Sequence, residues 1–190
     1  MKKGQEYIGI VEKVDFPNKG TINYVNEDGT VTKVAVKGAI LGQKVRFVIS
    51  KKRSGKCEGR ILEVVEKSVY ENRVAPCEHF ETCGGCTYQQ VDYDTQMKFK
   101  GDMIKDILDG VCDDYEYEGI LGSPMEWAYR NKMEFSFGDE FKDGPLALGM
   151  HKKGSFHDIV TISDCHIVNE DYNAILRVVL GYFADKEIPF

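Results

Sequence analysis

The stretch Cys77-Glu78-His79-Phe80-Glu81-Thr82-Cys83-Gly84-Gly85-Cys86 decides how the rest of this 190-residue sequence is interpreted. It places three cysteines close together, and a fourth candidate, Cys165, follows in Ser163-Asp164-Cys165-His166, where a fold can bring it near. The two glycines carry no side chain, so the backbone can turn tightly and bring amide groups close to sulfur. The set predicts a four-thiolate metal or iron-sulfur site.

Zinc and an iron-sulfur cluster both suit four thiolates, because soft sulfur ligands bind either. Zinc ribbons usually contain two Cys-x2-Cys pairs. Here Cys83 and Cys86 form one such pair, while Cys77 and Cys165 each stand alone. The spacing therefore does not decide between zinc and an iron-sulfur cluster.

Other residues near the cysteines have simpler interpretations. His79 and His166 could join a zinc site, but with four cysteines available we interpret them as neighbours of the ligands. Cys57 falls in a strand pattern and Cys112 in a loop, so both are predicted to be packing or incidental thiols.

Length and composition indicate an ordered chain at the upper end of one domain or the lower end of two small ones. There is no apolar run of about 18 residues, and no apolar signal core follows Met1-Lys2-Lys3. We therefore expect a cytoplasmic protein with no membrane partner. Thiols stay reduced in that compartment, so six cysteines favour metal binding over disulfides.

The formal net charge of −6 hides an asymmetry. Residues 1–67 hold 14 Lys and Arg against 8 Asp and Glu, whereas residues 68–190 hold 11 against 23. A basic front joined to an acidic rear is typical of a nucleic-acid-facing module attached to something else.

The front is predicted to be all β, because short β-branched segments alternate with turn residues. Asp28-Gly29 is a strong hairpin signal, since glycine takes the positive φ that the turn needs. Five strands in about 60 residues fit a small OB-like barrel. We place them at residues 6–14, 21–25, 31–36, 44–50 and 57–65.

The turn between the last two predicted strands is the densest positive patch of the chain, with Lys51, Lys52, Arg53 and Lys56. OB-like barrels often bind oligonucleotides, and lysine and arginine neutralise phosphates. The simpler interpretation is a solvated hairpin tip whose charges keep a sheet edge apart from other chains. The pattern alone favours neither.

The rear is predicted to be α+β. A helix begins near Asp92 or Asp94, is interrupted by Gly101 and ends near Gly110. Strands follow at residues 132–138, 146–151 and 158–163, and a final helix begins at Asn169 and stops before Pro189. The acidic run at residues 113–118 is expected to be an exposed loop or short strand.

Taken in order, these features resemble the TRAM-domain RNA uracil-5 methyltransferases. The resemblance is carried by a small β-barrel, then Cys77-x5-Cys83-Gly84-Gly85-Cys86-x2-Gln89, Tyr129-Arg130-Asn131-Lys132 and Ser163-Asp164-Cys165. It implies a TRAM barrel at residues 1–67 and an iron-sulfur-bearing central α+β domain at residues 68–190. It also implies that Cys77, Cys83, Cys86 and Cys165 hold a 4Fe-4S cluster.

The resemblance further implies the reaction. Such enzymes transfer a methyl group from S-adenosylmethionine to carbon 5 of a uridine in ribosomal or transfer RNA, with 23S rRNA the expected partner here. Their catalytic groups lie in a C-terminal Rossmann-like domain. This sequence has no G-x-G-x-x-G after a strand and no identifiable nucleophile. We therefore expect an N-terminal portion that is monomeric and inactive alone.

Two cations accompany the central-domain motif. Arg130 and Lys132 lie within three residues in an otherwise acidic half, and strand alternation would put both on one face. We hypothesise that they meet RNA phosphates, although internal pairing of Arg130 with a nearby carboxylate remains open.

Two rival interpretations belong to other classes. One is a non-enzymatic RNA-binding adaptor with an iron-sulfur or zinc site, and the other is a zinc-binding structural protein with no nucleic-acid partner. In each case we predict a structural role for the metal, because metal-ligand bonds contribute folding free energy when the unfolded chain has no preformed site.

Overall fold

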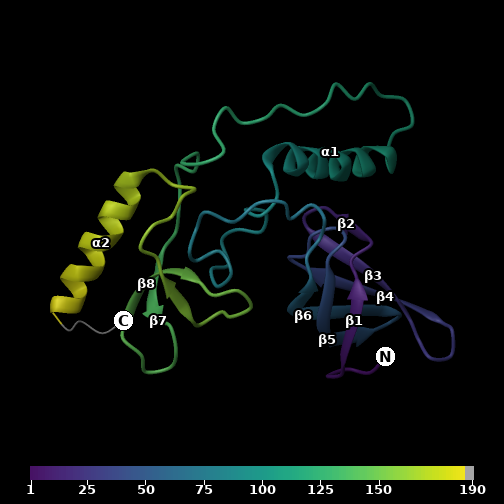
Figure 1. Cartoon of the computed structure of the whole chain (residues 1–190), viewed down its shortest axis with the longest axis horizontal. Coiled ribbons are helices and arrows are strands. Elements are labelled where there is room, and N and C mark those ends of the chain that lie inside the picture. The colour runs from purple at the N-terminus through teal and green to yellow at the C-terminus, as the bar shows by residue number, and fades with distance from the viewer. Residues whose placement is uncertain (187–190) are drawn as a thin grey trace. The chain divides into compact units, whose positions relative to one another are not determined.

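The computed structural model describes residues 1–186 (Figure 1). Its contacts divide the chain into two compact units, each made of two segments. The first unit combines Met1–Arg73 with Gln90–Leu121, and the second combines Val74–Gln89 with the chain from Gly122 onward. The three-cysteine stretch therefore belongs to the second unit, whereas the helix that follows it belongs to the first. The functional modules at residues 1–67 and 68–190 stay a prediction.

The first unit is built on a six-stranded mixed sheet. The sheet order is β1-β5-β6-β4-β3-β2, and all neighbours are antiparallel except β4 and β6, which run parallel. The strands are β1 (Glu6–Ile10), β2 (Lys13–Asp15), β3 (Lys19–Val25), β4 (Val31–Lys37), β5 (Lys44–Arg53) and β6 (Lys56–Glu66).

The prediction of five strands in a barrel needs correction, because the first predicted strand divides in two. At Val11 the backbone N–H donates to Gln43 O at 2.9 Å, and at Glu12 it donates to Thr21 O at 2.9 Å. The chain thus changes partner here, so that β1 pairs with β5 and β2 with β3. These consecutive strands are the two edges of the sheet, and strand pairing among the described residues closes no barrel.

A hydrophobic core lies within this unit. Along β5 the inward side chains Val45, Phe47 and Ile49 are at most 1% exposed, as the two-residue period of a strand requires. Cys57 joins them at 4% exposed, which confirms it as a packing thiol. By contrast, Cys112 is exposed and its thiol donates to Asp114 O at 3.4 Å.

Helix α1 (Tyr93–Asp109) begins and ends where the sequence predicts, with Asp92 as N-cap and Gly110 as C-cap. The predicted interruption at Gly101 was wrong, because the helix continues through it. A Cβ at this position would lie 3.1 Å from the Tyr117 hydroxyl. The glycine therefore permits close approach of a neighbouring segment and does not break the helix.

The second unit contains a three-stranded antiparallel sheet and one helix. Its sheet order is β7-β8-β9, with β7 (Ser136–Asp139), β8 (Leu146–His151) and β9 (Ile159–Thr161). Helix α2 (Glu170–Asp185) begins one residue after the predicted start, Asn169, which is its N-cap, and packs Leu176 against Leu148 and Ile162. The predicted stop at Pro189 lies outside the described residues.

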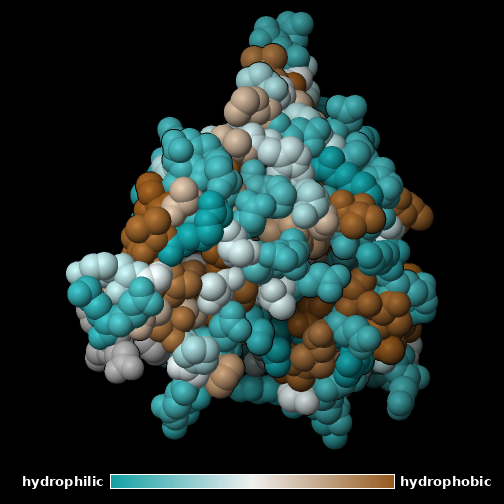
Figure 2. All heavy atoms as spheres, turned by 60° about the vertical axis from the view of Figure 1, so that its left-hand side comes forward, coloured by the Kyte–Doolittle hydropathy of each residue, from teal (hydrophilic) through white to brown (hydrophobic). Residues whose placement is uncertain are grey.

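The surface shows no continuous hydrophobic band on the face drawn in Figure 2, where hydrophobic side chains form separate groups among hydrophilic ones. Scattered exposed apolar groups are ordinary on protein surfaces. Within residues 1–186, no helix is both long and apolar enough to cross a membrane.

The cap of α1 predicts a pH effect. Hydrogen bonds from the Thr95 backbone N–H and from Asn72 lower the pKa of Asp92 from 3.8 to about 2. A depressed pKa contributes stability that is present above pH 3.8 and is lost as pH falls through about 2. The melting temperature of wild type should exceed that of Asp92→Asn above pH 4. This difference should disappear near pH 2, and one that persists below pH 2 would contradict the prediction.

Two glycines in the second unit predict opposite responses to alanine. A Cβ at Gly149 in β8 would lie 2.0 Å from Val160 O and 2.9 Å from Ile162 N, so the backbone must shift. Gly149→Ala should therefore lower the free energy of unfolding by at least about 1–3 kcal/mol. A Cβ at Gly181 in α2 meets nothing within 4 Å, so Gly181→Ala should raise it by about 0.5–1 kcal/mol. Denaturant titration of both variants tests this contrast.

Candidate metal centre

All four predicted cysteine ligands line one pocket of the second unit, with about 370 Å³ of empty space that is partly open to solvent. Cys77, Cys83, Cys86 and Cys165 are each half-buried. Apolar side chains make up most of the remaining lining: Phe80, Met133, Met150, Ile162 and Ile167. The fold thus brings the distant Cys165 to the three-cysteine stretch.

The three-cysteine stretch is held against the end of β8 by a close backbone approach. The Gly84 N–H donates to His151 O at 2.9 Å, and a Cβ on Gly84 would lie 2.9 Å from the same oxygen. A side chain would therefore push the stretch away from the strand. The Gly85 N–H donates to Cys83 Sγ at 3.3 Å, which confirms that the glycines bring an amide close to sulfur.

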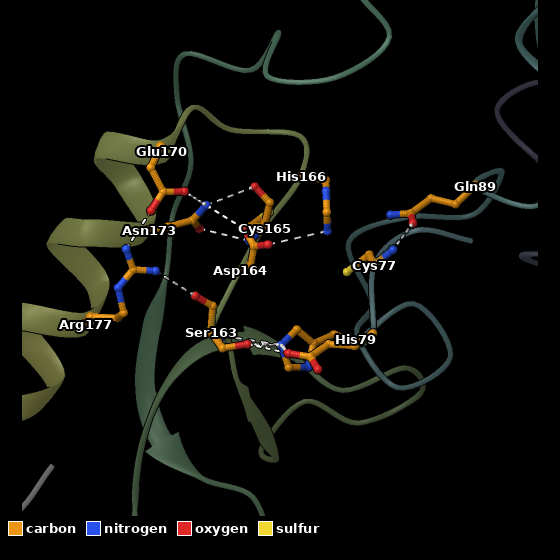
Figure 3. Close-up of polar contacts among 11 residues, drawn as sticks. Cys77, His79, Gln89, Ser163, Asp164, Cys165, His166, Glu170, Asn173 and Arg177 are labelled. Atoms are coloured by element: carbon orange, nitrogen blue, oxygen red, sulfur yellow. Dashed lines mark hydrogen bonds and ion pairs between the residues drawn. The ribbon is translucent and has the colours of Figure 1, made fainter. Parts of the chain in front are cut away.

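Cys165 is fixed by helix α2. It follows β9, and its backbone N–H donates to Asn173 Oδ1 at 2.9 Å (Figure 3). Asn173 Nδ2 donates in turn to Asp164 Oδ1 at 3.0 Å. Gln89 has a similar place at Cys77, where its Oε1 accepts the backbone N–H at 3.3 Å. Two buried amides therefore hold the backbone at two candidate ligands.

The two cysteine-bearing segments are also joined by side chains. Ser163 Oγ lies 2.9 Å from His79 Nε2 and donates to Glu78 Oε1 at 2.5 Å, while the Ser163 N–H donates to His79 Nε2 at 3.3 Å (Figure 3). His166 Nε2 lies 3.6 Å from Asp164 Oδ2. The role of His79 and His166 as neighbours of the ligands stays a prediction.

Burial raises the pKa of the Cys77, Cys83 and Cys165 thiols, because desolvation disfavours the thiolate. Backbone N–H groups act in the opposite direction, and for Cys165 they come from Ile167 and Val168. Without a cation these thiols remain protonated at neutral pH. A bound metal would deprotonate them, since only thiolates ligate.

Lys153 places a positive charge beside the three-cysteine stretch. Its Nζ donates to Phe80 O at 2.6 Å and lies 4.4 Å from the centre of the Phe80 ring. Burial lowers the pKa of Lys153, while Cys83 and Cys86 act to raise it. The amine therefore holds the loop through the Phe80 carbonyl. It also interacts electrostatically with the sulfurs of Cys83 and Cys86.

The four thiols share a pocket, but they are not arranged as ligands of one ion. Within residues 1–186, no group of three or more His, Cys, Asp or Glu side chains is arranged to hold a single metal ion.

The predicted basic turn is shorter and better defined than the sequence suggested. Strands β5 and β6 extend through Arg53 and from Lys56, which pair across a two-residue turn. Both turn residues, Ser54 and Gly55, have positive φ, as a type I′ hairpin requires. The four basic side chains are exposed at its tip: Lys51, Lys52, Arg53 and Lys56.

Arg130 and Lys132 are not arranged as predicted, because β7 starts only at Ser136 and strand alternation does not apply to them. The Arg130 N–H donates to Ile167 O at 2.9 Å, and its Nε donates to Lys132 O at 3.1 Å. Lys132 forms an exposed ion pair with Glu134. The side chain of Arg130 therefore donates to a backbone carbonyl, and the alternative of a carboxylate partner is not seen among the described residues.

Sequence reasoning missed three site residues: Asn173, Ser163 and Lys153. Asn173 carried one signal, since it occupies the helical positions shared with Leu176 and Leu180. A polar residue on an apolar helix face is a candidate for a buried hydrogen-bonding role. The other two carried no such signal, because their partners come from segments distant in sequence.

Comparison with known proteins gives relatives but no matching family model. An uncharacterized RNA methyltransferase of Caldanaerobacter subterraneus is 41% identical over 192 residues, which cover 100% of this chain and 41% of the relative. Uncharacterized RNA methyltransferases of Clostridium tetani and Clostridium acetobutylicum are each 40% identical over 190 residues, covering all of this chain and 40% of the relative. The chain spans about two fifths of the length of these curated relatives.

Proposed function

We propose that this chain is the RNA-binding and cluster-binding portion of an S-adenosylmethionine-dependent RNA methyltransferase that modifies carbon 5 of uracil in 23S rRNA. Homologues about 40% identical over the whole chain are named RNA methyltransferases, which supports the general activity. The base and the RNA are what the resemblance of the cysteine motif to the TRAM-domain RNA uracil-5 methyltransferases implies. The methyl donor would be bound by a further part of the whole enzyme.

The convergence of Cys77, Cys83, Cys86 and Cys165 on one pocket is the observation that carries the proposal. The donor set suits an iron-sulfur cluster, because it offers four thiols, an amide N–H directed at sulfur and an apolar lining that limits water. These four residues would hold the 4Fe-4S cluster. When bound, such a group would supply iron-thiolate bonds that join two distant chain segments.

A cluster places looser demands on the positions of four thiols than a single ion does. One zinc ion needs its sulfurs about 2.3 Å from a common centre. A cluster with several irons can bond each thiolate to a different iron, so the sulfurs stand farther apart. Zinc remains the alternative metal, and measured metal content separates the two.

RNA contact is proposed for two groups of cations. Arg53 and Lys56 face each other at the exposed tip of the β5–β6 hairpin, with Lys51 and Lys52 beside them. Arg130 and Lys132 form the second group. Exposed cations strengthen the binding of a protein to RNA by releasing counterions from the phosphates. The affinity of this contact should therefore depend strongly on salt.

The cluster proposal predicts metal content. Anaerobically prepared chain should contain about four iron atoms and absorb in the visible iron-sulfur region. Cys83→Ser should lose most of the iron, because a thiolate ligand is removed. Cys112→Ser, whose thiol lies outside the pocket, should keep it. Iron and zinc are measured together by elemental analysis, and a colourless, zinc-loaded protein would defeat the assignment.

The RNA proposal predicts a change in salt dependence. Arg53→Ala combined with Lys56→Ala should weaken RNA binding and reduce the slope of log affinity against log salt by about 1.4–1.8, as expected for two lost phosphate contacts. Lys132→Ala should reduce the slope by about half as much. Lys98→Ala, which removes an exposed helix lysine paired with Asp102, is the matched control. An unchanged slope removes the altered residue from the contact set.

A further inference from the structure

Asn173 is a buried polar residue in an unfavourable place. It is 2% exposed and lies near the start of α2, on the side that carries Leu176. Asparagine is a weak helix former, and a buried amide is costly unless its hydrogen bonds are made. Neither helix formation nor burial therefore accounts for this residue, but its partners do.

The Asn173 amide is used as both acceptor and donor. Its Oδ1 accepts the Cys165 N–H at 2.9 Å, and its Nδ2 donates to Asp164 Oδ1 at 3.0 Å (Figure 3). Longer contacts of 3.4 Å and 3.5 Å join Nδ2 to Glu170 Oε2 and Cys165 O. Aspartate has no donor and would repel the two carboxylates, and leucine offers neither group.

We propose that Asn173 is a positioning residue that fixes the backbone at Cys165 so that its thiolate is held for the metal centre. The inference rests on the proposed cluster function. Bonds to the consecutive residues Asp164 and Cys165 restrict the backbone from which the thiol projects. Asn173 holds a ligand and not the metal. Loss of such an outer partner typically weakens metal binding by about 10- to 100-fold.

Helix packing can be separated from this positioning role. Leu176 lies three residues further along α2, is 5% exposed, and packs with Leu148 and Ile162. It holds the helix on the sheet without a hydrogen bond to the Cys165 backbone. Leu176→Ala therefore provides a matched control that weakens the packing of α2 and removes no hydrogen bond to the Cys165 backbone.

The test measures how fast the anaerobically reconstituted chain releases iron to a chelator. Wild type is compared with Asn173→Ala, Leu176→Ala, Cys165→Ala and the double variant Cys165→Ala/Asn173→Ala. The temperature is kept below every melting transition, which circular dichroism establishes. Asn173→Leu, which fills the same space without polar groups, replaces the alanine variant if that variant does not fold.

We expect Asn173→Ala to release iron at least about ten times faster than wild type. Leu176→Ala should stay near the wild-type rate. Once Cys165 is absent there is no ligand left to position, so adding Asn173→Ala should change the rate by less than about two-fold. After one-electron reduction of the cluster with dithionite, the electron paramagnetic resonance spectrum of Asn173→Ala should also shift toward that of Cys165→Ala.

Two outcomes would overturn the inference. In one, wild type holds its cluster and both Asn173 variants release iron no faster than Leu176→Ala. In the other, Asn173→Ala accelerates release equally with and without Cys165, which would place its effect elsewhere. A wild-type chain that takes up neither iron nor sulfide would instead defeat the proposed function, and this inference with it.

Discussion

The backbone contact between Gly84 and His151 is the constraint around which the second unit is arranged. It draws the three-cysteine stretch onto the end of β8, and only a residue without Cβ can approach that closely. A second bond from the Lys153 N–H to Thr82 O, at 2.8 Å, continues the approach. Strand β8 also pairs with β9, and β9 leads to Cys165. The position of β8 therefore relates the three-cysteine stretch to the fourth cysteine. Main-chain contacts therefore bring the four thiols to one pocket.

Much of the local structure could be predicted from the sequence, because its determinants are local. Asp28-Gly29 forms the predicted hairpin turn, and Gly29 has a φ of 79°. Asp92 and Asn169 cap the two helices as their residue types predict. The strand at residues 146–151 was predicted with the observed bounds. The four predicted cysteines line one pocket, and their role as ligands stays a prediction.

What could not be predicted depends on contacts between distant segments. No local signal at Val11 and Glu12 reveals that their N–H groups bond to different parts of the sheet. Glycine is a residue type that weakens helices, and only the approach of Tyr117 reveals why one is accommodated within α1 at Gly101. The prediction that Lys132 begins a strand was wrong for the same reason. The backbone N–H of Arg130 bonds to Ile167 and not to a neighbouring strand.

The interleaving of the two units has a consequence for the order in which the chain can mature. Residues 74–89 leave the ribosome before α1 completes the first unit, so three thiols are made well ahead of the fourth. At typical translation rates the stretch from Cys86 to Cys165 takes on the order of ten seconds to synthesise. During that interval the early thiols have no completed pocket, and Cys165 has no helix to hold it until Asn173 follows. The complete four-cysteine pocket therefore forms only after the final helix has been synthesised.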